Sequence, residues 1–262
     1  MLSKNYLKRI WKTRYFWLHL ALADLRAKYR RSMLGLGWSI LQPLALTLLL
    51  SFVMGNFFHI DIRDYAPYIF SGLIIWEFIV STAVSGCMAF INSGSYIKQF
   101  SHPLVIYSLR GVLASLVNLA LAFVGLVLWV LFTKPENFGF SWLSLILAFP
   151  LLLMVSWPLS TVCAFIGTQF RDFSQLVTII LQAVWYASPV FFEASMFRST
   201  HIGFLVDYNP VYHILNLFRA PMLHGQFPDI NNYLFTIAFS AILMLLSLYL
   251  IQRNEQTVIF YI

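Results

Sequence analysis

Charged residues are scarce in this sequence. Asp, Glu, Lys and Arg together make up 10% of its 262 residues, against roughly a quarter in soluble domains. Apolar residues account for 60% and aromatic residues for 18%, and the mean hydropathy is +0.77. A water-facing surface needs more charge, whereas membrane proteins use aromatic rings at their interfaces. The composition therefore predicts an integral membrane protein.

Motifs for metal binding and catalysis are missing as well. Cys87 and Cys163 stand alone in apolar runs, so neither a zinc site nor a disulfide framework is indicated. The six histidines form no i,i+4 pair, and the sequence has neither HExxH nor Gly-x-Ser-x-Gly. Without a Gly-Lys-Ser/Thr tripeptide the chain has no P-loop for ATP. We expect no metal ion and no cofactor in this chain.

Positive charge is concentrated at the N-terminus. Residues 1–31 hold nine Lys or Arg and one acidic residue, whereas residues 32–262 hold eight basic and nine acidic residues. One basic segment of this kind favours an anionic membrane face or an acidic protein as its partner. We expect no interaction with nucleic acid, since the rest of the chain carries no excess of positive charge.

Six apolar stretches could cross a bilayer, which takes about 20 helical residues. They are 33–58, 66–91, 111–132, 140–169, 173–192 and 233–251. Pro150 and Pro158 interrupt the fourth, where neighbouring helices can satisfy the freed carbonyls. An even number of spans puts both termini on one side. That side would hold thirteen Lys or Arg against four, which makes it the cytoplasm by the positive-inside rule.

The segment before the first span is predicted to be one amphipathic helix on the cytoplasmic membrane surface. Its apolar residues at helical spacing are Leu7, Trp11, Tyr15, Leu18, Leu22, Leu25 and Tyr29. Its interfacial basic residues are Lys8, Lys12, Arg26, Arg30 and Arg31. A signal peptide cleaved after Ala23 is the alternative, but it would send basic residues outward directly before the first span. The chain then divides into an interfacial helix at 1–32 and a six-span domain at 33–262.

The loop between the fifth and sixth predicted spans is too apolar for a plain extracellular excursion. Segments 195–206 and 210–224 are short and aromatic, and residues 207–210, reading DYNP, separate them. Stretches of about 10–14 such residues are more often re-entrant or interfacial than spanning. We predict a helical hairpin that dips into the outer leaflet.

Glu77 is the one obvious carboxylate in the middle of a predicted span. An intramembrane ionisable group is by default a functional hypothesis. Glu77 could line a substrate pathway, or it could be protonated or hydrogen-bonded within the bundle or at a subunit contact. The sequence predicts no intramembrane Lys, Arg or His beside it, which argues against a proton-coupled transporter.

Three segments on the predicted cytoplasmic side carry further signals. Residues 24–43 read DLRAKYRRSMLGLGWSILQP and turn a basic helix through Gly35 and Gly37 into the first span. Residues 168–173 read TQFRDF and place a charged pair in a very short loop. Residues 92–103 read NSGSYIKQFSHP, which is long enough for one or two helical turns that could seat in a groove of a soluble partner.

Together these segments resemble the membrane subunits of ABC-2 type exporters, in particular the permeases for O-antigen, capsular polysaccharide and teichoic acid. The resemblance covers nearly the whole chain and includes residues 185–190, reading WYASPV, and residues 208–212, reading YNPVY. It implies an all-α, six-span permease in a bacterial inner membrane, forming a homodimer that encloses a channel. Two copies of a separate cytoplasmic ATPase subunit would bind ATP and magnesium.

The resemblance also implies residue roles. The loop between spans two and three would form a coupling helix against the ATPase, with the candidates Ser95, Tyr96, Ile97, Lys98, Gln99 and Phe100. Arg171 and Asp172 are further coupling candidates, with Arg171 expected to pair with Asp172 or with carbonyls at the span ends. A lipid-linked glycan would thread the channel, where aromatic rings stack on the apolar faces of sugars. The candidate channel residues are Trp38, Trp76, Phe78, Trp185 and Tyr186.

Other functions are compatible with the sequence. The same architecture exports drugs, lipids or haem-related molecules, although the compact length, the N-terminal helix and the outer hairpin favour a glycan. A membrane-embedded transferase acting on lipid-linked sugars would need clustered acids, histidines or a metal motif, for which Glu193, Asp207 and His213 are scattered candidates. A non-catalytic scaffold would not need so elaborate a hairpin.

Overall fold

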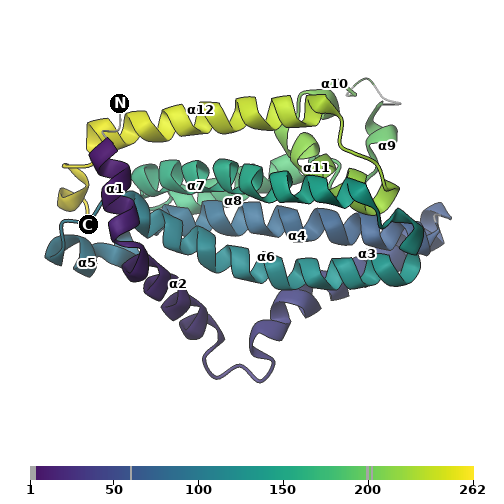
Figure 1. The fold of residues 1–262 in the computed structure, drawn as a ribbon, viewed down its shortest axis with the longest axis horizontal. Helices are drawn as coiled ribbons and strands as arrows, with labels where there is room; N and C mark the ends of the chain where they lie inside the picture. Colours follow the sequence, from purple (N-terminus) through teal and green to yellow (C-terminus); the bar gives the residue numbers. More distant parts are fainter. Residues whose placement is uncertain (1–3, 60, 199–200, 202) are drawn as a thin grey trace.

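The computed structural model describes residues 4–59, 61–198, 201 and 203–262 (Figure 1). Over this part of the chain it is all-helical, without strands, which confirms the all-α part of the predicted fold class for the described residues. Parts of the predicted segments 1–32 and 195–206 fall on residues 1–3, 199–200 and 202, which lie outside the described residues. The side chain of Leu7 also lies outside them.

Five helices among the described residues are long and apolar enough to cross a membrane. They are α3 (Trp38–Phe58), α4 (Ile62–Cys87), α6 (Val105–Thr133), α7 (Leu145–Gln169) and α12 (Ile230–Asn254). Two 3-10 helices lead into them, η1 (Gly35–Gly37) before α3 and η4 (Phe140–Ser144) before α7. Each long helix covers one of the predicted apolar stretches. These five stretches are confirmed as helices.

The fifth predicted span, 173–192, is the exception. Its helix α8 covers Phe173–Tyr186, which is 14 residues, or about 21 Å at 1.5 Å per residue, and is shorter than a hydrocarbon core of about 30 Å. The chain turns at Ala187 because Pro189 has no main-chain N–H with which to continue the helix. The carbonyls of residues 189–192 accept hydrogen bonds from other helices instead. The prediction of one continuous apolar helix over 173–192 is wrong.

Helix α7 tolerates its two prolines, as expected for a span packed among other helices. Pro150 and Pro158 both lie inside it, and α7 runs unbroken from Leu145 to Gln169. Each proline removes one main-chain hydrogen bond and crowds the carbonyl four residues earlier. Packing of α7 against α4 and α12 holds the helix together across both positions, as neighbouring helices commonly do in membrane proteins.

The long helices lie side by side, with α4 packed against both α6 and α7, and α7 packed against α12 (Figure 1). Both chain termini lie at one end of this bundle, together with α1 (Lys4–Lys12) and α5 (Gly94–Gln99). The short helices α9 (Ala194–Arg198) and α10 (Phe204–Asp207) lie at the opposite end. We call these the α5 end and the α10 end. The two termini thus share one end of the bundle, as predicted.

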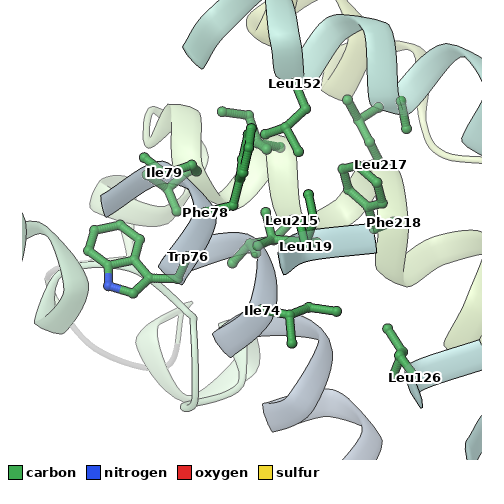
Figure 2. Close-up of a cluster of buried hydrophobic side chains, with 14 of the residues drawn as sticks. Ile74, Trp76, Phe78, Ile79, Leu119, Leu126, Leu152, Leu215, Leu217 and Phe218 are labelled. Atoms are coloured by element: carbon green, nitrogen blue, oxygen red, sulfur yellow. The ribbon is translucent and has the colours of Figure 1, made fainter. Parts of the chain in front are cut away.

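Helix α4 is the central element of the core. Its side chains pack with those of α6 and α7, and α11 (Pro210–His224) inserts a buried face among them. Figure 2 shows this cluster, with Phe78 from α4, Leu119 from α6, Leu152 from α7 and Phe218 from α11. The predicted helical segment 210–224 is therefore part of the core.

Helices α4 and α7 approach each other closely where glycines face the neighbouring backbone. A Cβ on Gly86 would lie 2.7 Å from the carbonyl oxygen of Ser160, and one on Gly167 would overlap the carbonyl of Cys87. Small residues at such positions let membrane helices pack backbone to backbone. The contact between Gly167 and Cys87 also places the last turns of α4 and α7 together at the α5 end.

Gly167→Val is therefore expected to force α4 and α7 apart, because the added side chain has no space beside Cys87. Overpacking of this kind costs roughly 1–3 kcal/mol, and we expect a markedly lower yield of monodisperse protein in size-exclusion chromatography. Gly139→Val is the matched control, since a Cβ at Gly139 meets nothing within 4 Å. Equal yields of the two variants would contradict the close packing of α4 on α7.

The N-terminal segment forms two helices instead of the single predicted one, and that prediction is wrong. Helix α1 ends at Lys12, and α2 covers Arg14–Tyr29. Between them the Thr13 hydroxyl bonds to the carbonyls of Arg9 (3.1 Å) and Ile10 (3.0 Å). A side chain that bonds backward in this way favours a bend in the helix.

Helix α2 does not bury the predicted apolar stripe as a whole. Ala21 and Leu25 are buried. The exposed members of the stripe are Trp11, Tyr15, Leu18 and Leu22. The predicted interfacial basic residues are also exposed; they are Lys8, Lys12, Arg26, Arg30 and Arg31. Exposed aromatic and basic side chains on neighbouring helices suit the headgroup layer of a membrane.

Candidate functional site

The predicted coupling segment forms a short helix at the α5 end. Helix α5 follows the 3-10 turn η2 (Ile91–Ser93) and gives way to extended backbone at Phe100. Ile97 packs against a buried apolar cluster. The other candidates are exposed, namely Ser95, Tyr96, Lys98, Gln99 and Phe100. The helix thus presents a mixed polar and aromatic face away from the bundle.

Helix α5 is braced by α2 and by the C-terminal segment. The ring centre of Phe16 in α2 lies 5.9 Å from that of Tyr96 and 4.9 Å from that of His102. The Lys98 ammonium donates to the main-chain oxygen of Ile262 (2.7 Å). These contacts come from segments far apart in the sequence, so α5 is held in a fixed place without losing its exposed face.

Polar contacts tie together the two ends of the chain beside α5. The Tyr6 hydroxyl donates to Glu255 Oε1 (2.7 Å), which also accepts from the main-chain N–H of Leu104 (3.3 Å). Arg9 donates to the main-chain oxygen of Ser101 (2.8 Å). Burial and the neighbouring Glu255 carboxylate raise the pKa of the Tyr6 phenol. The phenol therefore stays protonated and continues to donate its hydrogen bond.

The second coupling candidate lies at the same end of the bundle. The loop 170–172 joins α7 to α8, beside the contact between the last turns of α4 and α7. Arg171 and Asp172 are both exposed. Within the described residues no ion pair joins them and no helix-end carbonyl accepts from Arg171, so the expected pairing of Arg171 is absent there. Both side chains face solvent and are accessible to a partner.

A small cavity of about 100 Å³, lined by both polar and apolar side chains, lies between α2, α3, α4 and α6. We call it the inner cavity. Glu77 lines it together with two candidate channel residues, Trp38 and Phe78, and with Lys28 and Asn118. The mid-span carboxylate therefore shares a cavity with polar, aromatic and basic side chains, and it is not enclosed in the apolar core.

Polar contacts hold α2 against α3 and α6 beside the inner cavity. The Tyr29 hydroxyl donates to Asn118 Oδ1 (2.8 Å), and Ser39 Oγ lies 2.9 Å from the Tyr29 hydroxyl and 3.1 Å from Asn118 Oδ1. Arg110 Nε lies 3.0 Å from Asp24 Oδ2. Burial raises the pKa of the Asp24 carboxyl, and the charge of Arg110 opposes that shift. These contacts clamp α2, with its basic surface, to the bundle.

At the α10 end a buried arginine organises the turn after α8. Arg219 of α11 is 2% exposed. Its guanidinium donates to the main-chain oxygens of Tyr68 (3.0 Å), Pro189 (2.6 Å) and Val190 (2.5 Å) and to Ser71 Oγ (3.3 Å). It also lies 3.7 Å from the centre of the Tyr68 ring. Among the described residues no carboxylate pairs with it, so carbonyl dipoles and an aromatic face stabilise its charge.

Two tyrosines of α4 complete the anchoring of this turn. The Tyr65 hydroxyl donates to the main-chain oxygen of Phe191 (2.7 Å), and the Tyr68 hydroxyl donates to that of Phe192 (2.9 Å). With the bonds from Arg219, all four carbonyls of residues 189–192 accept from α4 or α11. The chain can leave the helical conformation here because its polar backbone groups remain satisfied.

The two motifs at 185–190 and 208–212 meet at this site. Asn209 Nδ2 donates to the Ala187 carbonyl (3.1 Å) and to Ser188 Oγ (2.7 Å). Its Oδ1 accepts from the Val211 N–H (2.9 Å) and caps α11. The Asn209 side chain thus caps the N-terminus of α11 and is hydrogen-bonded to the residues that directly follow α8.

The candidate channel residues do not converge on one place. Trp38, which is 47% exposed, and the buried Phe78 line the inner cavity. Trp76 is buried beside a separate apolar cavity of about 480 Å³ between α4, α7, α8 and α11. Trp185 and Tyr186 end α8 with their ring centres 5.4 Å apart, and Tyr186 is 56% exposed. Trp38 and Tyr186 leave the most ring surface available to a substrate or a second subunit.

The contacts of Arg219 and the ion pair of Asp24 with Arg110 were not predicted from the sequence. Signals for both are present. Arg219 is a charge inside the apolar segment 210–224, and Asp24 is the only acid among residues 1–31. Charged groups persist in apolar surroundings when they are paired or hydrogen-bonded, so each isolated charge predicts a partner on another helix.

The alternative of an embedded transferase finds no catalytic cluster in the described part of the chain. No group of three or more His, Cys, Asp or Glu lies together there in a way that could hold a metal ion. Two of the scattered candidates have other partners. Asp207 pairs with Arg198 (2.7 Å), and His213 Nδ1 lies 2.9 Å from Asn232 Oδ1.

Comparisons with known proteins agree with the motifs. The profile of the ABC-2 type transporter family matches residues 15–223. The O-antigen export system permease protein RfbA of Klebsiella pneumoniae is 22% identical over 225 residues, covering 84% of each chain. The polysialic acid transport protein KpsM of Escherichia coli is 22% identical over 246 residues, covering 92% of this chain and 93% of the relative. The resemblance predicted from the motifs is confirmed, and this multi-pass membrane protein has bacterial permeases as relatives.

Proposed function

Because the chain belongs to the ABC-2 type transporter family, we propose that it is the permease subunit of an ATP-driven exporter of a lipid-linked polysaccharide of the O-antigen or capsule type. Permeases of this family work with separate ABC ATPase subunits, and this chain has no P-loop of its own. The names of two relatives support the substrate class, since they refer to O-antigen export and polysialic acid transport. In this proposal two ATPase copies bind ATP and magnesium.

The position and exposure of helix α5 are the observations that support a partnership with an ATPase subunit. This helix of six residues lies at the end of the bundle that holds both termini, with most of its side chains exposed although contacts from α2 and the C-terminal segment brace it. It connects the end of α4 at Cys87 to the start of α6 at Val105. A partner that moves α5 would therefore move both helices, which is how closure of an ATPase dimer would reach the membrane domain.

We infer six membrane crossings, with the α5 end in the cytoplasm of a bacterial inner membrane. Helices α3, α4, α6, α7 and α12 would each cross alone, and α8 would cross together with the turn at 187–192. Helices α9 to α11 would return within the outer leaflet. This orientation puts the basic segment 1–31 on the inner face. Residues 1–32 would form an interfacial appendage to a membrane domain at 33–262.

A homodimer would complete the channel. Helices α3 and α8 leave much of their apolar surface uncovered. Their exposed side chains include Leu41, Leu48, Phe52, Leu176, Ile179 and Ile180. Pairing of these faces across two subunits would bury that surface and bring Trp38 and Tyr186 towards a shared path. Aromatic rings along such a path would stack on sugar rings without fixing a particular sequence, so a repeating glycan could slide.

Combining Tyr96→Ala with Lys98→Glu is expected to uncouple ATP hydrolysis from export. The changes remove an aromatic ring and reverse a charge on the exposed face of α5. In membrane vesicles that contain the ATPase, we expect glycan export to fall about tenfold or more, equivalent to ~1.4 kcal/mol, while ATP hydrolysis continues. Arg63→Glu, an exposed charge at the opposite end, is the control. Export at the wild-type rate by the α5 variant would refute the coupling role.

A further inference from the structure

A larger, polar cavity lies at the α10 end, outside the residues considered for coupling or for the channel. It has a volume of about 710 Å³ and lies between α10, α11 and the first turns of α12. We call it the outer cavity. Small-molecule sites commonly measure about 300–1,000 Å³, so the outer cavity is large enough for more than one sugar ring.

Contacts made by His213 connect the helices that line the outer cavity. His213 of α11 stacks on Phe235 of α12, with ring centres 4.2 Å apart and planes 4° apart. The two nitrogens of His213 lie 2.9 Å from Asn232 Oδ1 and 2.9 Å from the main-chain oxygen of Asp207. These contacts join α10, α11 and α12, the helices that line the cavity.

Aromatic rings stand at the sides of the outer cavity. Tyr208 is 73% exposed and Phe227 is 65% exposed, although both line the cavity. Tyr212 is half-buried beside them. Exposed rings around a polar cavity provide flat apolar faces, which match the C–H faces of pyranose sugars.

Polar side chains with unused hydrogen-bonding capacity complete the lining. They are Asn216, His224, Gln226 and Asn231. None of their side chains has a hydrogen-bond partner within the described residues. Each of the three amides presents a donor and an acceptor side by side. This arrangement matches neighbouring hydroxyl groups on a sugar ring, which also donate and accept.

The charges around the outer cavity disfavour an anionic ligand. Among the lining residues that the structure describes, Arg198 is the one Lys or Arg, and it is already paired with Asp207 (2.7 Å). Asp229 adds a second carboxylate. Burial and the charge of Lys134 lower the pKa of His224, so its imidazole is neutral near pH 7. With two carboxylates and one guanidinium, the lining would repel a phosphate or an acidic sugar.

We propose that the outer cavity binds an uncharged oligosaccharide stretch of the exported glycan, with sugar rings stacked on Tyr208 and Phe227 and hydroxyls bonded to Asn216 and Asn231. This inference rests on the proposed function and narrows its substrate class to neutral polysaccharides. The site lies at the end of the bundle opposite α5, where an exported chain emerges. Binding there holds the emerging chain between successive ATP-driven steps.

The test uses the full chain in phosphatidylcholine nanodiscs, whose headgroups carry no sugar and no net charge. The labelled discs are applied to an array of neutral bacterial oligosaccharides and of acidic ones, including oligomers of sialic acid. We expect retention on at least one neutral oligosaccharide and weaker retention on acidic ones. No retention on any neutral oligosaccharide, or a preference for acidic ones, would overturn the proposal.

Two variants place the binding in the outer cavity. Combining Tyr208→Ala with Phe227→Ala is expected to weaken retention about tenfold or more, because both stacking faces are lost. Asn231→Ala changes only an exposed side chain and is expected to weaken it several-fold. The control combines Phe132→Ala with Phe260→Ala, two rings that are highly exposed elsewhere. Unchanged retention by both cavity variants would refute the assignment.

The oligosaccharide array tests the outer-cavity assignment, whereas copurification of the chain with its partner proteins tests the proposed function. The two outcomes can be told apart. If an ATPase subunit copurifies with the chain but no neutral oligosaccharide binds, the outer-cavity assignment is overturned and the exporter proposal stands. If neutral oligosaccharides bind in the outer cavity but no ATPase subunit associates, the proposal of ATP-driven export is overturned instead, and the assignment of the outer cavity as a neutral sugar site is supported.

Discussion

Replacing Arg219 with methionine is expected to lower the melting temperature of the protein strongly. The variant removes the guanidinium donor from four acceptors, namely the main-chain oxygens of Tyr68, Pro189 and Val190 and the hydroxyl of Ser71. The oxygens of Pro189 and Tyr68 keep one neutral donor each, the hydroxyls of Tyr68 (3.2 Å) and Ser71 (2.8 Å). Hydrogen bonds to a charged group contribute about 1.5–3 kcal/mol each. Since neighbouring losses are not additive, we expect a total of roughly 3–5 kcal/mol, similar to that of breaking a buried ion pair.

The measurement is thermal melting of the purified protein in detergent, followed by tryptophan fluorescence. A loss of about 3–5 kcal/mol corresponds to a fall of roughly 10 °C in a chain of this size. Arg219→Lys should recover only part of it, because an ammonium group lacks the planar set of donors that reaches all these oxygens. Arg63→Met, at an exposed position, should melt like the wild type. If Arg219→Met melts within about 2 °C of the wild type, Arg219 does not organise this end.

A second large effect is expected where α2 meets α6, and it should be asymmetric. The Arg110 side chain is 12% exposed, whereas that of Asp24 is 38% exposed. Asp24→Leu strands a largely buried guanidinium, at a cost of about 3–5 kcal/mol. Arg110→Leu leaves a carboxylate that still reaches water and should cost less. The double variant should be more stable than Asp24→Leu alone, because no unpaired charge remains.

Melting temperatures of the three variants test this asymmetry, with Arg26→Leu as the control on an exposed part of α2. Glycan export by these variants should fall together with their melting temperatures, because α2 would lose one of the contacts that clamp it to the bundle. The hydrogen bonds of Tyr29 with its partners on α3 and α6 would remain. Equal destabilisation by Asp24→Leu and Arg110→Leu would contradict the role assigned to burial.

The five long helices could be predicted from the sequence because local properties decide them. An uninterrupted apolar run of sufficient length has to satisfy its backbone internally in a membrane, and a helix does so. Helix α5 could be predicted for a related reason, since the polar segment 92–103 lies between two such runs. Its exposed face follows from its position at the end of the bundle.

The early end of α8 could not be predicted from residues 173–192 alone. Pro189 is a local signal, but the turn also depends on donors far away in the sequence, at Tyr65 and Tyr68 before it and at Arg219 after it. The two prolines of α7 show the reverse case, because a span packed against neighbouring helices is expected to tolerate them and α7 stays continuous.

The candidate channel residues could be predicted only as a class. Trp76 and Tyr186 are both aromatic residues in apolar segments, yet Trp76 is buried and Tyr186 is exposed. The side of a helix that faces its neighbours is set by tertiary packing, so an aromatic residue in an apolar segment can be either buried or exposed. The sequence therefore identifies aromatic rings suited to sugars but not the rings that a sugar can reach.

The most direct test of the account is the identification of the proteins that accompany this chain in its native membrane. The tagged chain would be extracted in several mild detergents, its partners identified and quantified, and the purified material assayed for ATP hydrolysis. We predict an ABC ATPase subunit in a one-to-one ratio with the chain, together with ATP hydrolysis. A chain that is recovered alone and inactive towards ATP in every detergent would contradict its assignment as the permease subunit of an ATP-driven exporter.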